Sequence, residues 1–358
     1  MDSKTINVGV VGYGFSAKVF HIPLITSTAG MKLVAVLERS ADTSKQQFPD
    51  ISVCKTIQEI LHDSASVDLL VITSVNSTHY EYAKLAILAK KHVVVEKPFT
   101  IKYEQAAELA RLAAENNVVL SVYHNRRYDS DFLTVSKLIR SNLLGNIVEV
   151  SSRFDRFRAT KKSPNAWREN ANEEGSGILF DLGPHLIDQA ICLFGMPSSL
   201  FATLSNQRLI QNGPDDYFQI SLFYPNKNLT VNLAASMLAA IKPPRFHIFG
   251  SNGSFIKFNL DPQEDQLKAG INPLTDPSFG VESPDNYGSI VTSATPENIR
   301  IDGKVASERG NYLLYYANVR DAILGSAPLA VTAQQAAQTV LVIEKAFQSA
   351  TSNSVVTL

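Results

Sequence analysis

Ile6-Asn7-Val8-Gly9-Val10-Val11-Gly12-Tyr13-Gly14-Phe15-Ser16-Ala17 is the stretch that decides the fold of this chain. Its apolar first half predicts a buried strand, and the G-x-G-x-x-A pattern that follows opens a helical pattern. Gly12 permits a tight turn, Gly14 lets the backbone approach a pyrophosphate, and Ala17 permits close packing of helix on strand. Amides at the start of the helix, around Phe15 and Ser16, then face the phosphates. This order of elements predicts a dinucleotide-binding site.

Outward from this turn, short apolar runs alternate with helical patterns as far as residue 125. The runs occupy residues 31–37, 68–73, 92–95 and 118–122, and the clearest helical patterns occupy residues 78–89 and 103–115. Near-continuous Val, Ile and Leu strands between helices are typical of a parallel sheet covered on both faces. Residues 1–125 are therefore predicted to form a doubly wound α/β domain of the Rossmann type.

The rhythm of the sequence changes after residue 125. Residues 199–258 contain longer strand candidates that are separated by short stretches of turn-forming residues, as in β-hairpins. Residues 181–194 form the chief helical pattern before them. This predicts an α+β domain over residues 126–358 with a mostly antiparallel sheet. Residues 262–306, rich in Pro, Asp, Asn, Gly and Ser, are predicted to be loop, and helical patterns at 312–324 and 333–349 close the chain.

Composition narrows the class of protein. The 358 residues carry 33 Lys and Arg against 34 Asp and Glu, so the chain lacks the basic surplus that is usual in a nucleic-acid binder. Cys54 and Cys192 lie far apart without a Cys/His cluster, so neither a metal site nor a disulfide framework is expected, and a reducing compartment fits. No apolar stretch reaches the ~20 residues of a membrane span, and no secretory signal pattern precedes the first strand. We expect a soluble, cytoplasmic protein without nucleic-acid or membrane partners.

The end of the second predicted strand carries a mixed signal about the cofactor. Glu38 occupies the place where an acidic side chain accepts from the ribose 2′-hydroxyl, which favours NAD. Arg39 and Ser40 follow at once, and an arginine is a good partner for a 2′-phosphate, which favours NADP. Glu38 could turn to solvent or pair with Arg39, and all three residues could equally be a polar strand end. These residues alone leave the choice open.

Glu96-Lys97-Pro98 follows the strand at 92–95, at the carboxyl edge of the sheet where ligands of doubly wound folds bind. A lysine at a strand end is most often a solvated surface residue. Lys97, however, lies between a buried type of strand and a rigid proline. A lysine held over a nicotinamide is able to donate to a reacting oxygen, so Lys97 is a candidate catalytic residue.

A second candidate set lies in Asp181-Leu182-Gly183-Pro184-His185. A helix that begins near Asp181 places Asp181, His185 and Asp188 on one face. Asp181 is also a plausible N-cap, and His185 is a plausible core imidazole. A carboxylate beside an imidazole equally suits a general base for a secondary alcohol, and a dinucleotide site in the same chain favours that interpretation.

Polar side chains at two further places are candidates for substrate contact. Residues 123–128 end the last parallel strand, where they either line a cleft or form the linker between domains. Trp167 and Arg168 lie in a polar loop, and together they are able to dock a sugar ring, although a lone Trp is more often packing. The candidates from these two places are Tyr123, Asn125, Arg126, Trp167 and Arg168.

Three motifs in this order resemble the Gfo/Idh/MocA oxidoreductase family: residues 12–17, Glu96-Lys97-Pro98 and Asp181-Leu182-Gly183-Pro184-His185. A closer similarity, to its branch of NADP-dependent scyllo-inositol dehydrogenases, runs through residues 20–24, 121–133, 167–169 and 261–265. The resemblance spans essentially the whole chain. It implies a Rossmann domain, a C-terminal α+β domain with a large open sheet, and assembly through that sheet into homodimers or homotetramers.

The resemblance also implies roles for individual residues. Lys97, Asp181 and His185 would be the catalytic set, in which His185 exchanges the hydroxyl proton, Lys97 stabilises the reacting oxygen, and Asp181 orients substrate and imidazole. The positions where the family usually touches the cofactor are occupied here by Thr73, Asn76, His79 and Glu96. Glu38 departs from the NADP-dependent branch, whereas Arg39 and Ser40 agree with it, so NADP is the expected cofactor and NAD the alternative.

The expected activity is hydride transfer between the nicotinamide and a secondary or anomeric alcohol of a cyclitol or sugar, with scyllo-inositol as the best candidate. Two other functions are known in relatives with this fold: a non-catalytic regulator that senses NAD(P), and a glycoside hydrolase that recycles bound NAD. The presence of Lys97, Asp181 and His185 together favours the dehydrogenase, and net reduction of the cofactor would argue against the hydrolase.

Overall fold

The computed structural model describes residues 4–63, 67–163, 166–293 and 299–358, and the chain divides into two compact units. Unit 1 comprises Met1–Asn125, Gln263–Phe279 and Asn311–Ala337, and unit 2 comprises Arg126–Pro262, Gly280–Gly310 and Gln338–Leu358. The first segment of unit 1 ends at Asn125, and unit 2 begins at Arg126. Unit 1 additionally contains two segments from the second half of the chain, which sequence analysis assigned to the C-terminal domain.

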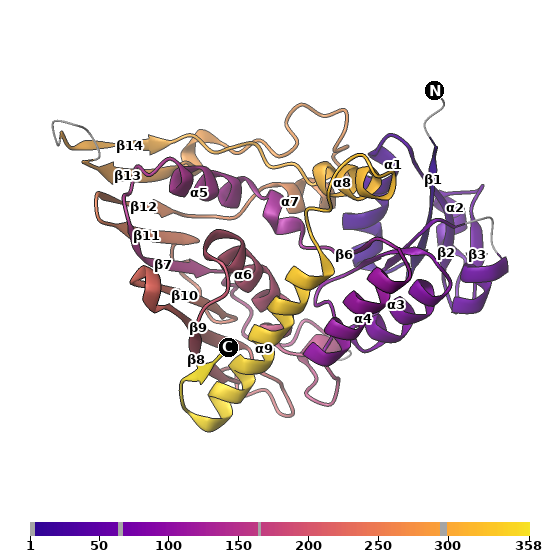
Figure 1. Cartoon of the computed structure of the whole chain (residues 1–358), viewed down its shortest axis with the longest axis horizontal. Coiled ribbons are helices and arrows are strands. Elements are labelled where there is room, and N and C mark those ends of the chain that lie inside the picture. Colours follow the sequence, from indigo (N-terminus) through magenta and orange to yellow (C-terminus); the bar gives the residue numbers. More distant parts are fainter. Residues whose placement is uncertain (1–3, 64–66, 164–165, 294–298) are drawn as a thin grey trace. The chain divides into compact units, whose positions relative to one another are not determined.

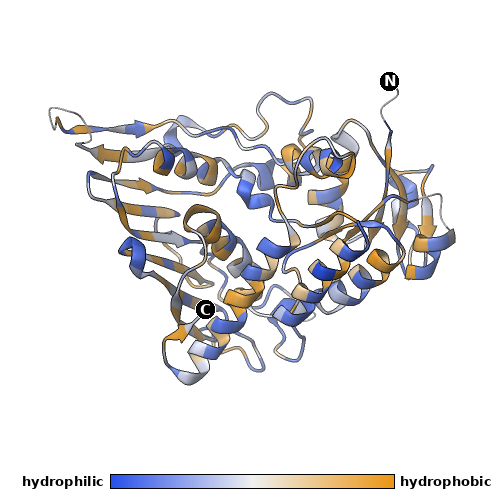
Figure 2. Cartoon of the chain, viewed as in Figure 1, coloured by the Kyte–Doolittle hydropathy of each residue, from blue (hydrophilic) through white to orange (hydrophobic). Residues whose placement is uncertain are grey.

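Unit 1 is built on six parallel strands in the order β3-β2-β1-β4-β5-β6 (Figure 1). They are β1 Ile6–Val11, β2 Met31–Leu37, β3 Ser52–Cys54, β4 Leu69–Ile72, β5 His92–Val95 and β6 Leu120–Val122. Hydrophobic residues dominate these strands (Figure 2), and all four residues of β4 are buried, as expected for a strand covered on both faces. This strand order confirms the predicted Rossmann sheet, whose ligands bind at the carboxyl ends where the order reverses between β1 and β4.

Helices connect and cover these strands. Helix α1 (Ile22–Ser27) packs on β2, and α3 (His79–Leu88) packs on β4, β5 and α4 (Tyr103–Glu115). The bounds of α4 agree with the predicted 103–115 because its buried alanines and leucine recur at helical spacing on one face. Helix α2 (Thr43–Gln47) follows β2. Short helical turns are η1 Ala17–His21, η2 Glu59–Asp63, η3 Asn76–Thr78, η4 Asn125–Tyr128, η5 Trp167–Glu169, η6 Pro225–Lys227 and η7 Pro284–Asn286.

Two later segments complete unit 1. Helix α7 (Gln263–Lys268) contacts η1, and α8 (Leu313–Ile323) contacts α1. Tyr312, Tyr315 and Tyr316, at the start of α8, are almost fully buried. The core of the Rossmann unit therefore includes aromatic side chains that lie about two hundred residues beyond its last strand.

Unit 2 is built on nine strands in the order β14-β13-β12-β11-β7-β10-β9-β8-β15, and of these neighbours only β7 and β10 run parallel (Figure 1). The strands are β7 Ile147–Arg153, β8 Ser199–Ser205, β9 Tyr217–Tyr224, β10 Leu229–Ser236, β11 Phe246–Gly250, β12 Gly253–Lys257, β13 Gly288–Thr292, β14 Ile301–Val305 and β15 Val356–Thr357. The expectation of a large, mostly antiparallel sheet in an α+β domain is confirmed.

The prediction that residues 262–306 form a loop is wrong. This segment contains α7, β13 and β14 in addition to irregular stretches. The two strands are five residues each and are flanked by turn formers, and β14 is an edge strand that is mostly exposed. An exposed edge strand needs no alternation of hydrophobic and polar residues, so β14 lacked the periodic signal from which a strand is predicted. β13 does alternate in burial, but Gly288, Ser289 and Thr292 make up three of its five residues, so its sequence resembles a loop.

Helix α6 (Ile178–Phe194) packs on β9 and β10 and carries the second candidate set. The helix begins three residues before Asp181, so the predicted N-cap role of Asp181 is wrong. Its first turn is instead closed by Asp215, whose carboxylate accepts from the backbone N–H of Leu179 at 2.8 Å. Gly177 turns the chain into the helix with φ of +95°, and a Cβ there would lie 2.2 Å from the Asp215 carboxylate. The remaining helices are α5 Ser130–Arg140 and α9 Ala333–Ser352.

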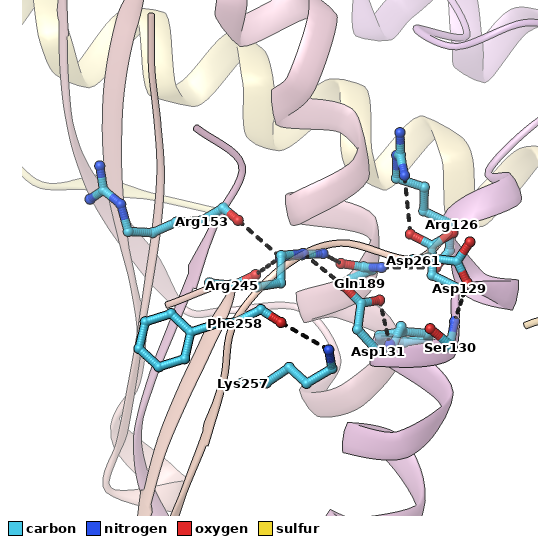
Figure 3. Close-up of polar contacts among 12 residues, drawn as sticks. Arg126, Asp129, Ser130, Asp131, Arg153, Gln189, Arg245, Lys257, Phe258 and Asp261 are labelled. Atoms are coloured by element: carbon cyan, nitrogen blue, oxygen red, sulfur yellow. Dashed lines mark hydrogen bonds and ion pairs between the residues drawn. The ribbon is translucent and has the colours of Figure 1, made fainter. Parts of the chain in front are cut away.

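A buried polar cluster ties α5 and α6 to the sheet of unit 2. Figure 3 shows the Arg245 guanidinium between Asp131 and Gln189. It donates to the Asp131 carboxylate at 3.0 Å, to the Gln189 side-chain oxygen at 2.6 Å and to the Ser152 hydroxyl at 2.6 Å. Gln189 lies one turn after His185 on α6 and donates in turn to the backbone oxygen of Arg126 at 2.8 Å. The orientation of α6 is thus set by hydrogen bonds as well as by apolar packing.

Candidate functional site

The glycine-rich turn between β1 and η1 has the geometry that its sequence predicts. Gly12 has φ of +93°, and a Cβ there would lie 3.3 Å from the Thr73 hydroxyl oxygen. The Thr73 hydroxyl donates to the backbone oxygen of Val11 at 2.9 Å, so the end of β4 closes the turn from the neighbouring strand. Glycine adopts this conformation without strain, and a Cβ at this position would also press tightly against the Thr73 hydroxyl.

The space around Gly14 shows whether the turn has room for a dinucleotide. A Cβ at Gly14 would meet no protein atom within 4 Å, so packing within the protein does not require glycine at this position. Close approach of a pyrophosphate to the backbone does require it. Ala17 is fully buried, as expected where helix and strand pack closely, while Phe15 is 58% exposed. The residues present therefore fit the cofactor.

Glu38, at the end of β2, makes a set of contacts that sequence analysis did not anticipate. One carboxylate oxygen accepts from the backbone N–H and the hydroxyl of Thr43, and the other accepts from the backbone N–H of Ser44 at 2.9 Å and its hydroxyl at 2.6 Å. Burial alone would raise the pKa of Glu38, but these hydrogen bonds outweigh it and lower the pKa. Glu38 therefore caps α2 and neither turns to solvent nor pairs with Arg39.

Arg39 and Ser40 lie on the loop between Glu38 and α2, and both are exposed. Lys55, which directly follows β3, holds this loop in place. Its ammonium group donates to the backbone oxygens of Glu38 at 3.2 Å and Ala41 at 2.7 Å. With Glu38 bound to α2, this loop presents four exposed residues, Arg39, Ser40, Ala41 and Asp42, and the Asp42 carboxylate pairs with the Lys55 ammonium group.

Glu96 and Lys97 follow β5 and adjoin the glycine-rich turn. One oxygen of the Glu96 carboxylate accepts from the Ser16 hydroxyl and, at 3.0 Å, from Nε2 of His21. The other oxygen accepts from the backbone N–H of Lys97 at 2.8 Å. Burial would raise the pKa of Glu96, but the hydrogen bond and charge of His21, with Lys97 and Ser16, lower it to about 2. Two expected cofactor residues, Ser16 and Glu96, are thus brought together beside the candidate catalytic lysine.

The remaining expected cofactor residues of unit 1 also gather at this sheet edge. His79 places Nδ1 2.8 Å from the backbone oxygen of Pro98 and Nε2 3.2 Å from that of Ser74, so it links the segments after β4 and β5. Asn76 begins the turn η3 before α3 and is 5% exposed. Both side chains therefore lie close to the strand ends at which a Rossmann fold binds its ligand.

Asp181 and His185 lie one turn apart on α6 in unit 2. The Asp181 carboxylate pairs with Arg156 at 3.0 Å and with Arg168 at 3.5 Å. The Arg168 guanidinium in turn stacks on the Trp167 ring, 4.2 Å from its centre, so these two substrate candidates and Asp181 form one cluster. His185 is 6% exposed and lies on the same helix face as Asp181.

Asp188, the third residue of that face, has a separate partner. Its carboxylate accepts two hydrogen bonds from the Arg127 guanidinium, at 2.8 and 2.6 Å. Burial would lower the pKa of Arg127, but the charge and hydrogen bonds of Asp188 raise it. A two-point pair of this kind fixes both side chains, and it holds α6 against the segment that follows β6.

The other substrate candidates occupy different environments. Tyr123 is 1% exposed, its ring lies 4.2 Å from that of His21, and its hydroxyl donates to the backbone oxygen of Phe20. Asn125 and Arg126 are each 6% exposed, and Arg126 pairs with Asp129 at 3.2 Å. The candidate catalytic set is divided between the units, with Lys97 in unit 1 and Asp181 and His185 in unit 2.

Several residues around the site were not predicted. His21 carried no chemical signal of its own, although it lies within a stretch that supports the family resemblance, and Tyr316 lies 295 residues further along the chain. Arg156, the partner of Asp181, sits in a basic stretch without a motif. Thr43 and Ser44 follow Glu38 at the spacing of a helix start, and this local pattern could have indicated a capping role.

Neither of two other kinds of site is found in the described part of the chain. Among residues 4–63, 67–163, 166–293 and 299–358, no three His, Cys, Asp or Glu side chains group as ligands for a metal ion. Within those same ranges, no helix combines the length and apolar character needed to cross a membrane.

Comparison with known proteins agrees with this architecture. Residues 6–124 match the family model described as "Oxidoreductase family, NAD-binding Rossmann fold", and residues 136–358 match "Oxidoreductase family, C-terminal alpha/beta domain". The chain belongs to the Gfo/Idh/MocA oxidoreductase family. It is therefore an oxidoreductase with an NAD-binding Rossmann domain, as the three motifs predicted.

Individual relatives match along almost the whole chain. The uncharacterized oxidoreductase YdgJ of Escherichia coli (strain K12) is 41% identical over 97% of this chain and 97% of its own length. The scyllo-inositol 2-dehydrogenase (NADP(+)) IolW of Bacillus subtilis (strain 168) is 38% identical over 96% of this chain and 94% of its own length. The crystal structure of an oxidoreductase from Bacillus cereus superposes with a TM-score of 0.89 at 33% identity and covers 99% of each chain.

Proposed function

We propose that this protein is an NADP-preferring dehydrogenase that acts on a secondary or anomeric alcohol of a cyclitol or sugar, with scyllo-inositol as the first substrate to test. The observation that carries the proposal is the position of Lys97, which follows β5 and is joined through Glu96 to the phosphate-binding turn at Ser16. The 38% identity to a scyllo-inositol 2-dehydrogenase supports the choice of substrate.

Each member of the catalytic set has a distinct role in this proposal. The nicotinamide, when bound, accepts the hydride from the alcohol carbon or returns it. His185 takes the hydroxyl proton during oxidation and gives it back during reduction. The Lys97 ammonium donates to the reacting oxygen, and Asp181 orients the substrate and the imidazole.

The contacts of Glu38 support the preference for NADP. An acidic side chain after the second strand favours NAD when its carboxylate is available to the ribose hydroxyls. Here both carboxylate oxygens of Glu38 accept hydrogen bonds from Thr43 and Ser44. Arg39, which is exposed on the same loop, is then the charged side chain that meets a 2′-phosphate, and an arginine binds a phosphate with two hydrogen bonds.

Replacing Arg39 by Ala is expected to weaken NADP⁺ binding roughly ten- to a hundred-fold, because one charge-assisted contact to the 2′-phosphate is lost. Binding of NAD⁺, which lacks that phosphate, should stay the same. Titration of each cofactor, followed by quenching of protein fluorescence, measures both constants. Lys45→Ala, an exposed charge change on α2, serves as the matched control. Equal loss of affinity for the two cofactors would show that Arg39 does not contact the 2′-phosphate.

The proposed activity is tested by following the absorbance of reduced nicotinamide with purified protein, NADP⁺ or NAD⁺, and scyllo-inositol, myo-inositol, D-glucose and D-xylose. We expect turnover with NADP⁺ and a cyclitol. Turnover with NAD⁺ but not with NADP⁺ would support the proposed dehydrogenase activity and contradict the proposed preference for NADP. Tight cofactor binding without turnover across a wide polyol panel would favour the NAD(P)-sensing regulator or the NAD-dependent glycoside hydrolase.

We further propose that the enzyme works in the cytoplasm as a homodimer or homotetramer. The chain has two cysteines, Cys54 and Cys192, too few for a disulfide framework, which suits a reducing compartment. The resemblance to the family supports assembly through the nine-stranded sheet of unit 2. Light scattering of the purified protein gives the mass of the assembly directly.

A further inference from the structure

The Glu96 carboxylate, which is 12% exposed, connects three parts of unit 1. The Glu96 side chain accepts hydrogen bonds from the Ser16 hydroxyl, from His21 Nε2 and from the backbone N–H of Lys97. Ser16 belongs to the phosphate-binding turn, and Lys97 is the proposed catalytic lysine. The orientation of the Glu96 carboxylate therefore affects both the cofactor loop and the reacting end of the site.

His21 and Tyr316 determine that orientation. An ionised carboxylate only accepts hydrogen bonds, so His21 Nε2 must carry the proton that it shares with Glu96. Nδ1 of the same ring lies 2.6 Å from the Tyr316 hydroxyl, which accepts a hydrogen bond from an imidazolium and donates one to a neutral imidazole. Burial, with the charge of Glu96 and the nearby Tyr123 and Tyr315, raises the pKa of Tyr316 well above its ordinary value, so this hydroxyl keeps its proton.

The imidazole of His21 has no room to turn. His21 and Tyr316 are both fully buried. The ring of Tyr123 lies 4.2 Å from that of His21, and the ring of Tyr316 meets it edge-on with centres 6.1 Å apart. Packing and hydrogen bonds thus hold the imidazole with Nε2 aimed at Glu96.

We infer that His21 and Tyr316 are positioning residues, which fix the Glu96 carboxylate and through it join the phosphate-binding turn to Lys97. The inference rests on the proposed role of Lys97 for its effect on turnover, but its effect on cofactor affinity needs only the Rossmann site. Without His21, the part-buried Glu96 carboxylate loses a charge-assisted donor and turns toward water, which releases Ser16 and the backbone of Lys97. Cofactor affinity and turnover then fall together.

Three replacements of His21 separate positioning from packing. His21→Leu removes both hydrogen bonds, His21→Gln places an amide donor near the position of Nε2, and His21→Asn places one near the position of Nδ1. We expect His21→Leu to weaken NADP⁺ binding and to lower kcat, each about ten-fold or more, with the KM for the polyol unchanged. His21→Gln should recover most of both losses, and His21→Asn should recover less.

Tyr316 offers a variant that keeps the packing of the ring. Tyr316→Phe removes only the hydroxyl that faces His21, and it should weaken NADP⁺ binding in the same direction by a smaller factor. Tyr315→Phe is the matched control, because Tyr315 is equally buried on the same helix but donates to the Ser121 hydroxyl at 2.8 Å. Tyr315→Phe should leave cofactor affinity unchanged.

Cofactor titration without any polyol keeps this test separate from the identity of the substrate. The inference is overturned if His21→Leu binds NADP⁺ as the unmodified protein does, or if Tyr315→Phe and Tyr316→Phe weaken binding equally. It is also overturned if His21→Gln binds NADP⁺ as weakly as His21→Leu does while the two variants unfold at the same temperature. A protein that shows these affinity changes but oxidises no polyol would contradict the proposed function and leave the role of His21 in cofactor binding intact.

Discussion

Replacing either Lys97 or His185 by Ala lowers turnover by an expected factor of about a hundred or more. In the proposed mechanism, His185→Ala removes the group that exchanges the hydroxyl proton, and Lys97→Ala removes the cation that stabilises the charge developing on the reacting oxygen. Cofactor affinity should change little, because the proposed phosphate site is the turn around Gly12 and Gly14, which neither substitution alters. Steady-state kinetics with the best polyol of the panel, beside cofactor titration, measures the two quantities separately.

Lys102→Ala is the matched control for the lysine variant, since Lys102 is exposed and lies five residues further along the same segment. This control should turn over like the unmodified protein. Near-normal turnover in Lys97→Ala or in His185→Ala would exclude the role assigned to that residue. Loss of cofactor binding in step with turnover in Lys97→Ala would indicate damage to the fold of unit 1 and not to the chemistry.

Replacing Arg245 by Ala is expected to destabilise the protein by about 3–5 kcal/mol, because it leaves the buried Asp131 carboxylate without its cation. The Arg245 side chain is 2% exposed and that of Asp131 is fully buried. Burial lowers the pKa of Arg245, and the charges of Asp131 and Asp129 act against this, so the pairing is what makes the buried guanidinium tolerable. The same substitution removes a donor from Gln189 and with it one of the contacts that orient α6 (Figure 3).

Urea unfolding of the full chain measures this loss. Lys137→Ala is the control, since it breaks a solvent-exposed pair with Glu308 and should leave the unfolding midpoint almost unchanged. A double variant, Arg245→Met with Asp131→Leu, removes both charges and should regain much of the lost stability. If Arg245→Ala unfolds at the same urea concentration as Lys137→Ala, the buried pair is not a main support of unit 2.

The parts of the fold that could be predicted are those with a periodic or local signal. The strands β1, β2 and β5 and the helix α4 agree with their predicted bounds because each carries a mostly apolar run or a regular apolar stripe. The glycine-rich turn was predictable because its chemistry resides in consecutive residues. β3 was missed, since three residues are too short to show any period.

The parts that could not be predicted depend on contacts between distant residues. No property of Tyr316 in the sequence indicates that its hydroxyl meets His21, and no property of Arg156 indicates that it pairs with Asp181. The contacts of Glu38 were not predictable either, although its partners are close in the sequence. Its type and position indicate a carboxylate that binds the ribose, whereas in the structure the carboxylate accepts from Thr43 and Ser44. The type of a residue indicates which partners its side chain is able to bind, and only the folded structure shows which of those partners lies close enough.

Residues 263–279 and 311–337 belong to unit 1, although a long segment of unit 2 precedes them in the sequence. This arrangement affects how the chain folds during synthesis. During synthesis, the six parallel strands leave the ribosome long before Tyr312, Tyr315 and Tyr316, which complete their core. A fragment that ends at residue 125 lacks these aromatic side chains and exposes the apolar surface that they cover, so it should bind chaperones or aggregate. We therefore expect the nucleotide-binding half to complete its fold only when translation is almost finished, and to fail to fold when one continuous piece of its gene is moved into another protein.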